Sequence, residues 1–244
     1  MKIISSNVVD LRVPTSDALL GSDPFHTEPD YSSAVLRLET NTGLRGVSVV
    51  FTIGAGTDWI TYGINDLTQL VVDTTLEDFK KSPITLYKRL IDHHQLRWLH
   101  DGVFRMACGA VLNAMWDLWA KSENKPLWKL LVDLKPEFIV HNCIDWRNIK
   151  DALTPDEALE ILNKPASNKS KREQDMSEIG PKSYCTVGWL GLTNEQILAT
   201  IQKLQKTGFN AFKLKVGQDL ESDVARIKFT RDAIGPDQML MVDA

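Results

Sequence analysis

Two lysines stand one residue apart in the segment NAFKLKVG, residues 210–217, which otherwise has the apolar composition of a buried strand. Successive side chains of a strand point to opposite faces, so Lys213 and Lys215 share one face and Leu214 takes the other. Two ammonium groups in a confined site repel each other, which lowers the pKa of one and supplies a neutral lysine base near physiological pH. Asp243 ends another strand-like segment, and a carboxylate is the kind of ligand that Mg²⁺ takes.

These groups suit the removal of a proton from the carbon beside a carboxylate. One lysine takes the proton, the second ammonium attracts the carboxylate, and a divalent metal stabilises the ene-diolate that forms. A purely structural interpretation competes, because a K-x-K pair on an exposed edge strand commonly serves solubility and an Asp at a strand end commonly caps a helix. The K-x-K pair and Asp243 stand at matching ends of successive strand-like segments, which favours the chemical interpretation.

The segments that carry these residues alternate between strand and helix patterns. Three strand-like runs enclose two amphipathic helices, in the order 183–191, 193–208, 209–216, 219–235 and 238–244. Thr193 is a helix N-cap residue, and Gly208 and Gly235 are typical helix ends. This alternation predicts a parallel β/α arrangement. If the sheet closes into a barrel, the lysines and Asp243 lie at the carboxyl ends of neighbouring strands, where barrel active sites are found.

The first third of the chain has the pattern of a small antiparallel sheet. Its β-branched runs are residues 2–13, 33–40 and 45–53. Residues 13–31 are too long and irregular for a hairpin turn, and loops of that length inside a compact domain are usually functional or disordered. Roughly residues 103–120 predict a central buried helix, apolar nearly all round, in which Asn113 and Asp117 would need partners.

Composition excludes several classes of protein. Asp plus Glu number 32 against 28 Lys plus Arg, a net charge of −4, so we expect no nucleic acid as a partner. We also expect no membrane, because no apolar run approaches a spanning length. The start has no clear targeting peptide, and three scattered cysteines indicate neither a disulfide framework nor a zinc site. An intracellular protein, cytoplasmic or mitochondrial, fits best.

Several motifs carry a resemblance to a known family. They include LLGSDPFHTEPDYSSA, FTIGAGTDW, QLRWLH, CIDWRNIKDALTPDEAL, YCTVGWLGLT, FKLKVGQDLESD and IGPDQMLMVDA, and together they extend over essentially the whole chain. With them the chain resembles the enolase superfamily, in its mandelate racemase-like branch, and within that branch the L-fuconate dehydratases. K-x-K followed by V-D-A is shared across the superfamily, whereas the Gly-Ser-Asp loop and GWLG are narrower, dehydratase-like marks.

The resemblance implies a fold and a set of roles. The fold is an α+β capping domain followed by the first three strands of a TIM-type (β/α)-barrel, with boundaries at 1–135, a connecting segment over 136–183, and 184–244. The substrate-contacting loop would comprise Gly21, Ser22, Asp23 and Tyr31. Lys213 would bind substrate, Lys215 would act as the base, and Asp243 would be the first of three acids that hold Mg²⁺. The partner would be a small-molecule sugar acid, dehydrated to a 2-keto-3-deoxy acid.

The sequence departs from the family where the site should be completed. The other two metal carboxylates, and the histidine that protonates the departing hydroxyl, come in the family from later strands, and this chain carries three of the eight strands of a barrel. We therefore expect an amino-terminal part that is inactive alone. Two alternatives stay open, a truncated isoform that binds or pairs with another subunit and a hydroxy-acid racemase or epimerase of the same superfamily. Homo-oligomer formation also stays open.

Overall fold

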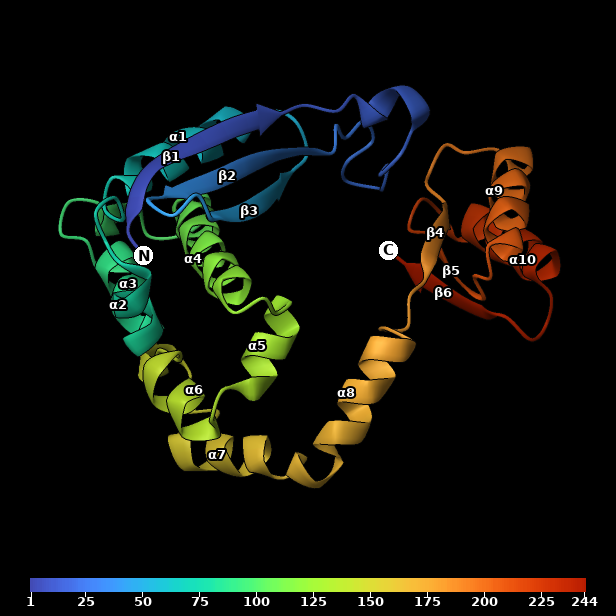
Figure 1. Ribbon diagram of the computed structural model, residues 1–244. Helices are drawn as coiled ribbons and strands as arrows, with labels where there is room; N and C mark the ends of the chain where they lie inside the picture. Colours follow the sequence, from blue (N-terminus) through green and yellow to red (C-terminus); the bar gives the residue numbers. More distant parts are fainter. The chain divides into compact units, whose positions relative to one another are not determined.

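The computed structural model describes residues 1–244, apart from the side chain of Ala166, and divides the chain into two compact units (Figure 1). The first unit comprises Met1–Leu11 and Ser32–Glu173, and the second comprises Arg12–Tyr31 and Gln174–Ala244. The irregular loop expected over 13–31 therefore belongs to the same unit as the β/α segment. The domain boundaries expected from the sequence stay a prediction.

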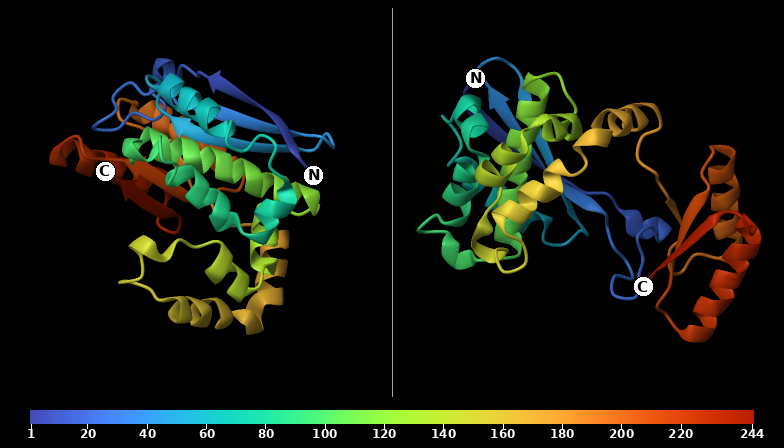
Figure 2. Two further views of the ribbon diagram at one scale, coloured as in Figure 1. Left: turned by 90° about the vertical axis from the view of Figure 1, so that its left-hand side faces the viewer. Right: turned by 90° about the horizontal axis from the view of Figure 1, so that it is seen from below.

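The first unit contains the antiparallel sheet expected from the sequence. Its strands are β1 (Ile3–Leu11), β2 (Ser32–Thr40) and β3 (Arg45–Thr52), hydrogen-bonded in the order β1-β2-β3. Alternation along β2 buries Ala34, Leu36 and Leu38 completely, because every second side chain of a strand points to the same face. Two helices, α1 (Thr57–Thr68) and α4 (Val103–Ser122), contact the sheet (Figure 2).

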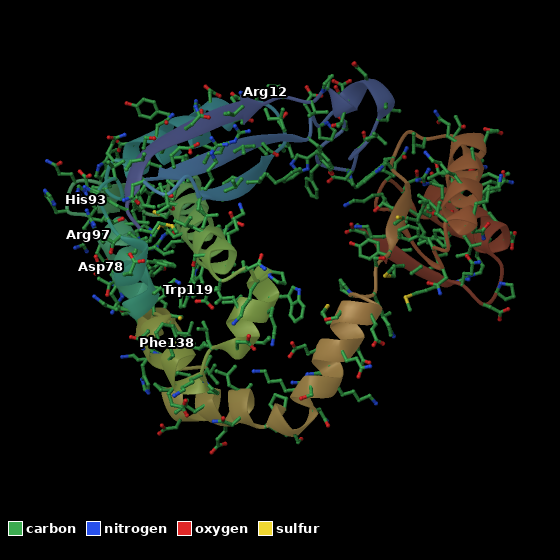
Figure 3. The ribbon with its side chains drawn as sticks, in the orientation of Figure 1. Arg12, Asp78, His93, Arg97, Trp119 and Phe138 are labelled. Carbon is green, nitrogen blue, oxygen red and sulfur yellow. The ribbon has the colours of Figure 1, made fainter. Side chains whose placement is uncertain are left out.

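The rest of the first unit is helical. Its shorter helices are α2 (Leu76–Lys81), α3 (Pro83–Ile91), α5 (Leu127–Asp133), α6 (Pro136–Asn142) and α7 (Pro155–Asn163), with 3₁₀ turns η2 (Arg97–Leu99), η3 (Trp146–Asn148) and η4 (Ala166–Asn168). Helix α8 (Lys169–Glu178) crosses the boundary between the units. Trp119 of α4 stacks on Trp116 and meets Phe138 of α6 edge to face, so these tryptophans are packing residues (Figure 3).

Helix α4 is the central buried helix that the sequence predicts, with one difference. Val111, Ala114 and Leu118 are fully buried. Asp117 has the partner it was expected to need, since its Oδ2 accepts a hydrogen bond of 2.7 Å from the backbone N–H of Val47. Asn113 is exposed, so the expectation that it would need a buried partner is wrong. The helix is covered on most of its circumference and open at that position.

The second unit contains the parallel β/α arrangement. Its elements are the 3₁₀ turn η1 (Thr15–Ala18), β4 (Cys185–Gly188), α9 (Asn194–Lys206), β5 (Ala211–Lys215), α10 (Leu220–Ile234) and β6 (Met239–Asp243). The strands pair in parallel in the order β4-β5-β6, and both helices lie on the same face of the sheet (Figures 1 and 2). Thr193 caps α9 in a capping box with Gln196. Phe212, Leu214 and Ile197 form the buried centre of this unit.

Candidate active site

The two lysines and the aspartate meet at one edge of the parallel sheet. Lys215 lies opposite Asp243 in the register of β5 and β6. Asp243 Oδ2 lies 2.8 Å from Lys213 Nζ and 3.1 Å from Lys215 Nζ, so one carboxylate oxygen stands between two ammonium groups. The lysine side chains keep 18% and 12% of their exposure, whereas Leu214 between them is fully buried on the other face. Strand alternation thus places both charges on one side.

The shared carboxylate determines the electrostatics of this cluster. Hydrogen bonds from Lys213 and then Lys215 hold the pKa of Asp243 below its usual range. Burial is the largest single influence on Lys213 and acts to lower its pKa, but the hydrogen bonds and charges of Asp243 and Tyr184 together outweigh burial, and that pKa is raised. Repulsion between the lysines was expected to lower the pKa of one of them, and Lys213 is not that one. The reason is the negative charge placed between the two ammonium groups.

The loop that precedes β2 brings Asp23 to the lysines. Asp23 Oδ2 lies 3.9 Å from Lys215 Nζ. Its Oδ1 accepts hydrogen bonds from the backbone N–H groups of Phe25 (2.9 Å) and His26 (2.7 Å), and the His26 imidazole Nδ1 lies 3.1 Å away. Burial acts to raise the pKa of Asp23, and the hydrogen bonds from His26 and Phe25 outweigh it and lower that pKa. Asp23 is therefore a fixed, ionised acceptor beside Lys215.

The other expected loop residues shape the loop itself. The Ser22 hydroxyl donates to the Thr27 carbonyl at 2.8 Å, so it is directed into the loop. Tyr31 donates its hydroxyl to the Gly21 carbonyl at 3.3 Å. Gly21 has φ +93°, and a Cβ there would come within 2.3 Å of the Tyr31 ring. Glycine at 21 therefore allows Tyr31 to lie against the loop.

The strand end GWLG supports the same loop. Tyr31 meets Trp189 edge to face, with ring centroids 6.1 Å apart. The Leu190 N–H donates to the Ser22 carbonyl at 3.2 Å. Gly217, which follows β5, also lies against the loop, since a Cβ there would be 3.0 Å from Pro24 Cγ. The loop is thereby joined to the ends of both β4 and β5.

One residue at the site was missed in the sequence. The Tyr184 hydroxyl lies 3.4 Å from Lys213 Nζ, and its ring centroid is 5.1 Å from the same ammonium. Thr186 pairs with Lys213 in the sheet, and Tyr184 precedes Thr186 by two positions on the same strand path. Side chains two apart in an extended chain share a face. The parallel register of the two strands was therefore the signal that could have identified Tyr184.

A magnesium site can be tested against the residues present. Asp243 supplies one carboxylate, and its Oδ2 already contacts two ammonium groups. Among the described residues there is no group of three or more His, Cys, Asp or Glu side chains that could hold a metal ion. Mg²⁺ usually retains several waters and takes carboxylates in near-octahedral geometry. The residues described here do not by themselves fit a complete magnesium site.

Comparison with protein families decides the membership of the chain. Residues 8–132 match the mandelate racemase / muconate lactonizing enzyme N-terminal domain, and residues 196–244 match the enolase C-terminal domain-like family. The chain belongs to the enolase superfamily. The resemblance drawn from its motifs is thereby confirmed, and so is the fold class of a capping domain followed by part of a barrel.

Three known proteins are similar to this chain to different degrees. The structure of human mitochondrial enolase superfamily member 1 is 42% identical with a TM-score of 0.94, covering 100% of this chain and 56% of that one. L-galactonate dehydratase from Hypocrea jecorina is 38% identical over 241 residues, covering 96% of this chain and 53% of that protein. The structure of L-talarate dehydratase from Polaromonas sp. JS666, solved with Mg and L-glucarate, is 19% identical with a TM-score of 0.65. The match covers 100% of this chain and 52% of that one, and it shows the fold alone.

The chain spans about half the length of the curated relatives it matches. Within the described part of the chain, no helix has the length and apolarity that crossing a membrane requires.

Proposed function

We propose that the chain is the capping domain and first three barrel strands of a sugar-acid dehydratase. The substrate would be a six-carbon acid such as L-fuconate, and the product a 2-keto-3-deoxy acid. The observation that carries the proposal is the carboxylate oxygen of Asp243 held 2.8 Å and 3.1 Å from Lys213 and Lys215 at the carboxyl ends of parallel strands. Similarity to L-galactonate dehydratase supports the substrate class.

Lys215 is the proposed base. Its ammonium group would first lose a proton, after which Nζ takes the proton from C2, the carbon beside the substrate carboxylate. The electrons of the broken C2–H bond form the ene-diolate, and the C3–O bond then breaks as the hydroxyl leaves with a proton as water. The resulting enol tautomerises to the 2-keto acid. The proton donor for the leaving hydroxyl is not assigned among these residues.

Lys213 and Asp243 are proposed to stabilise the negative charge of the substrate carboxylate and of the ene-diolate beside Lys215. Lys213, which the carboxylate keeps protonated, would bind the substrate carboxylate in exchange for part of its contact with Asp243. Asp243 would be one ligand of Mg²⁺, whose positive charge stabilises an ene-diolate. The further oxygen ligands would have to come from outside these 244 residues, because the described ones do not provide them.

The loop before β2 is proposed to bind the hydroxyl groups of the sugar-acid substrate. Asp23 is ionised and therefore an acceptor only, which suits a sugar hydroxyl that donates. The backbone N–H groups that fix its Oδ1 leave Oδ2 directed at Lys215, where the reacting carbon would lie. Substrate contacts are proposed for the same set as in the sequence, Gly21, Ser22, Asp23 and Tyr31.

The experiment is a turnover assay with the full-length protein and Mg²⁺. L-fuconate, L-galactonate and L-glucarate are incubated in D₂O, and proton NMR follows both the C2 hydrogen and the 2-keto-3-deoxy product. We expect product formation that Lys215→Met abolishes. Exchange of the C2 hydrogen without loss of water would instead indicate a racemase or epimerase. If no acid shows either exchange of the C2 hydrogen or product, proton abstraction at this site is refuted.

A further inference from the structure

One arginine of the second unit lies beneath the ends of two strands. Arg226 of α10 donates from Nη2 to the carbonyl oxygens of Trp189 (3.2 Å), Gly188 (3.3 Å) and Lys215 (3.5 Å), and from Nη1 to that of Leu192 (3.4 Å). These carbonyls belong to the carboxyl end of β4, the turn after it, and the carboxyl end of β5. A single guanidinium therefore joins the backbone of two neighbouring strands at the edge that carries the candidate site.

Asp223, one turn earlier on the same helix, holds the next residue of that edge. Its Oδ2 accepts a hydrogen bond of 2.8 Å from the backbone N–H of Gly217, two residues after Lys215. Residues three apart lie on one face of a helix, so Asp223 and Arg226 approach the strand ends together. The pair fixes the chain on both sides of Val216.

Stability alone does not account for these two side chains. Arg226 Nε and Asp223 Oδ1 are both buried, and neither has a hydrogen-bond partner among the residues that the structure describes. A buried donor or acceptor without a partner destabilises the fold, and an apolar side chain at the helix–sheet interface would avoid that effect. What the polar pair provides, and an apolar one would not, is a fixed position for four carbonyl groups.

The carbonyls that Arg226 holds belong to residues in or beside the candidate site. Lys215 is the proposed base, and Trp189 supports the ring of Tyr31 at 6.1 Å between centroids. Leu190, between two of the held carbonyls, donates its N–H to Ser22 of the substrate loop. The distance between the base and the loop is thus set through backbone that Arg226 contacts directly.

We propose that Arg226, supported by Asp223, is a positioning residue that fixes the spacing of the β4 and β5 ends and so aims Lys215 at the substrate carbon. This inference rests on the proposed function of Lys215. A planar guanidinium presents five N–H donors in a fixed fork and spans both strand ends, whereas the compact ammonium of a lysine does not. A positive charge at position 226 is therefore not enough to hold both strand ends. Arg226→Lys, which keeps the charge and loses the planar guanidinium, is tested beside Arg226→Met.

The test compares kinetics per folded molecule in the full-length protein. A misplacement of about 1 Å lowers a rate by about 100-fold, so we expect kcat to fall about 10- to 100-fold in both Arg226 variants with KM changed less than about threefold. Lys228→Met, an exposed change on the same helix, serves as the control and keeps wild-type kinetics. Wild-type kcat per folded molecule in both Arg226 variants would overturn the proposal, because a merely structural role lowers only the folded fraction.

A second measurement does not depend on turnover. Amide hydrogen exchange at Leu190 and Gly217, read by mass spectrometry or NMR, should become at least about tenfold faster in Arg226→Lys while amides of β1–β3 are unchanged. If wild-type protein dehydrates no sugar acid, the proposed function fails and this exchange alone decides whether Arg226 fixes the strand ends. Unchanged exchange at both amides would overturn the positioning role.

Discussion

The two units of the molecule bury different kinds of groups. The first unit is organised around a large apolar cluster that includes Leu36, Ile64 and Leu118. Its buried polar side chains are hydroxyls, such as that of Ser48, which donates to the Ala110 carbonyl at 2.7 Å. The second unit has a much smaller apolar cluster and directs charged side chains to the ends of its strands.

This difference separates packing from chemistry. Apolar burial at about 25 cal/mol per Å² is non-directional, so the first unit gains stability without needing charges inside. The charged groups of the second unit gain little stability, since Asp243 is partly exposed and surface ion pairs contribute about 0 to 1 kcal/mol. What they gain is a fixed arrangement of base, cation and acceptor. The contrast predicts that mutations in one unit change stability and in the other change activity.

The largest effect is expected at Lys215. Lys215→Met removes the proposed base, so kcat of the full-length protein should fall by about 10³-fold or more, within the range for general-base catalysis. The melting temperature should change little, because Met fills the space of the lysine stem and Lys213 still pairs with Asp243. Lys206→Met, exposed on α9, is the matched control. Unfolding of the second unit in Lys215→Met would contradict the separation of packing from chemistry.

Two glycines, one in each unit, allow the tightness of packing in the two units to be compared through stability. In the first unit a Cβ on Gly46 would lie 2.3 Å from the backbone carbonyl of Ala114, whereas in the second a Cβ on Gly188 would lie 2.4 Å from the Leu214 Cδ1 atom. A carbonyl inside a helix does not move aside, but a leucine methyl does. We expect Gly46→Ala to lower the free energy of unfolding by about 3 kcal/mol and Gly188→Ala by about 1 kcal/mol.

Urea unfolding followed by circular dichroism measures both glycine variants. Gly109→Ala on α4 is the control, since a Cβ there meets nothing within 4 Å. It should raise the free energy of unfolding by about 0.5 to 1 kcal/mol, as alanine favours a helix over glycine. Equal losses for Gly46→Ala and Gly188→Ala would show that the two units are packed equally tightly.

The sequence predicted most of the elements and one part of the site. The alternation of strands and helices from β4 to β6 followed from Thr193, Gly208 and Gly235, whose backbone preferences are local. The shared face of Lys213 and Lys215 followed from strand alternation alone. These features could be predicted because a few neighbouring residues determine them.

What the sequence did not predict depends on contacts between distant segments. Arg226 has the pattern of an exposed helix charge, and only the packing of α10 on the sheet brings it to the carbonyls of Trp189 and Lys215. The raised pKa of Lys213 could not be predicted for the same reason, because the position of Asp243 between the lysines depends on strand register. The packing of Pro24 against Gly217 likewise had no local signal.

Asp133 in the first unit provides a test in which the free energy of unfolding should change with pH by about 1 kcal/mol. The hydrogen bond from Lys129 at 2.7 Å, with Lys125 at 3.1 Å, lowers the pKa of Asp133 to about 2. A carboxyl whose pKa is lower in the folded state stabilises the fold above its unfolded pKa of about 3.9 and loses this effect as pH falls through about 2. Asp133→Asn should therefore unfold about 1 kcal/mol more easily at pH 7.

Measurement of this variant at several pH values isolates the ion pairs. The stability difference between wild type and Asp133→Asn, from urea unfolding, should shrink between about pH 4 and pH 2. Asp151→Asn, in an exposed turn of the same unit, should differ little from wild type throughout. A difference that stays constant with pH would mean that Asp133 acts through packing and not through its charge.

The smallest effect is expected at Asn113, and it tests whether α4 is open at this position and makes no polar contact there that supports the fold. Asn113 is exposed on α4, and alanine is a better helix former by about 0.5 kcal/mol, so Asn113→Ala should be neutral or slightly stabilising in urea unfolding. Asp117→Ala on the same helix should destabilise, because the Val47 N–H loses its acceptor. A clear loss of stability in Asn113→Ala would show that the Asn113 side chain supports the fold through a polar contact, as Asp117 does, and that α4 is not open at this position.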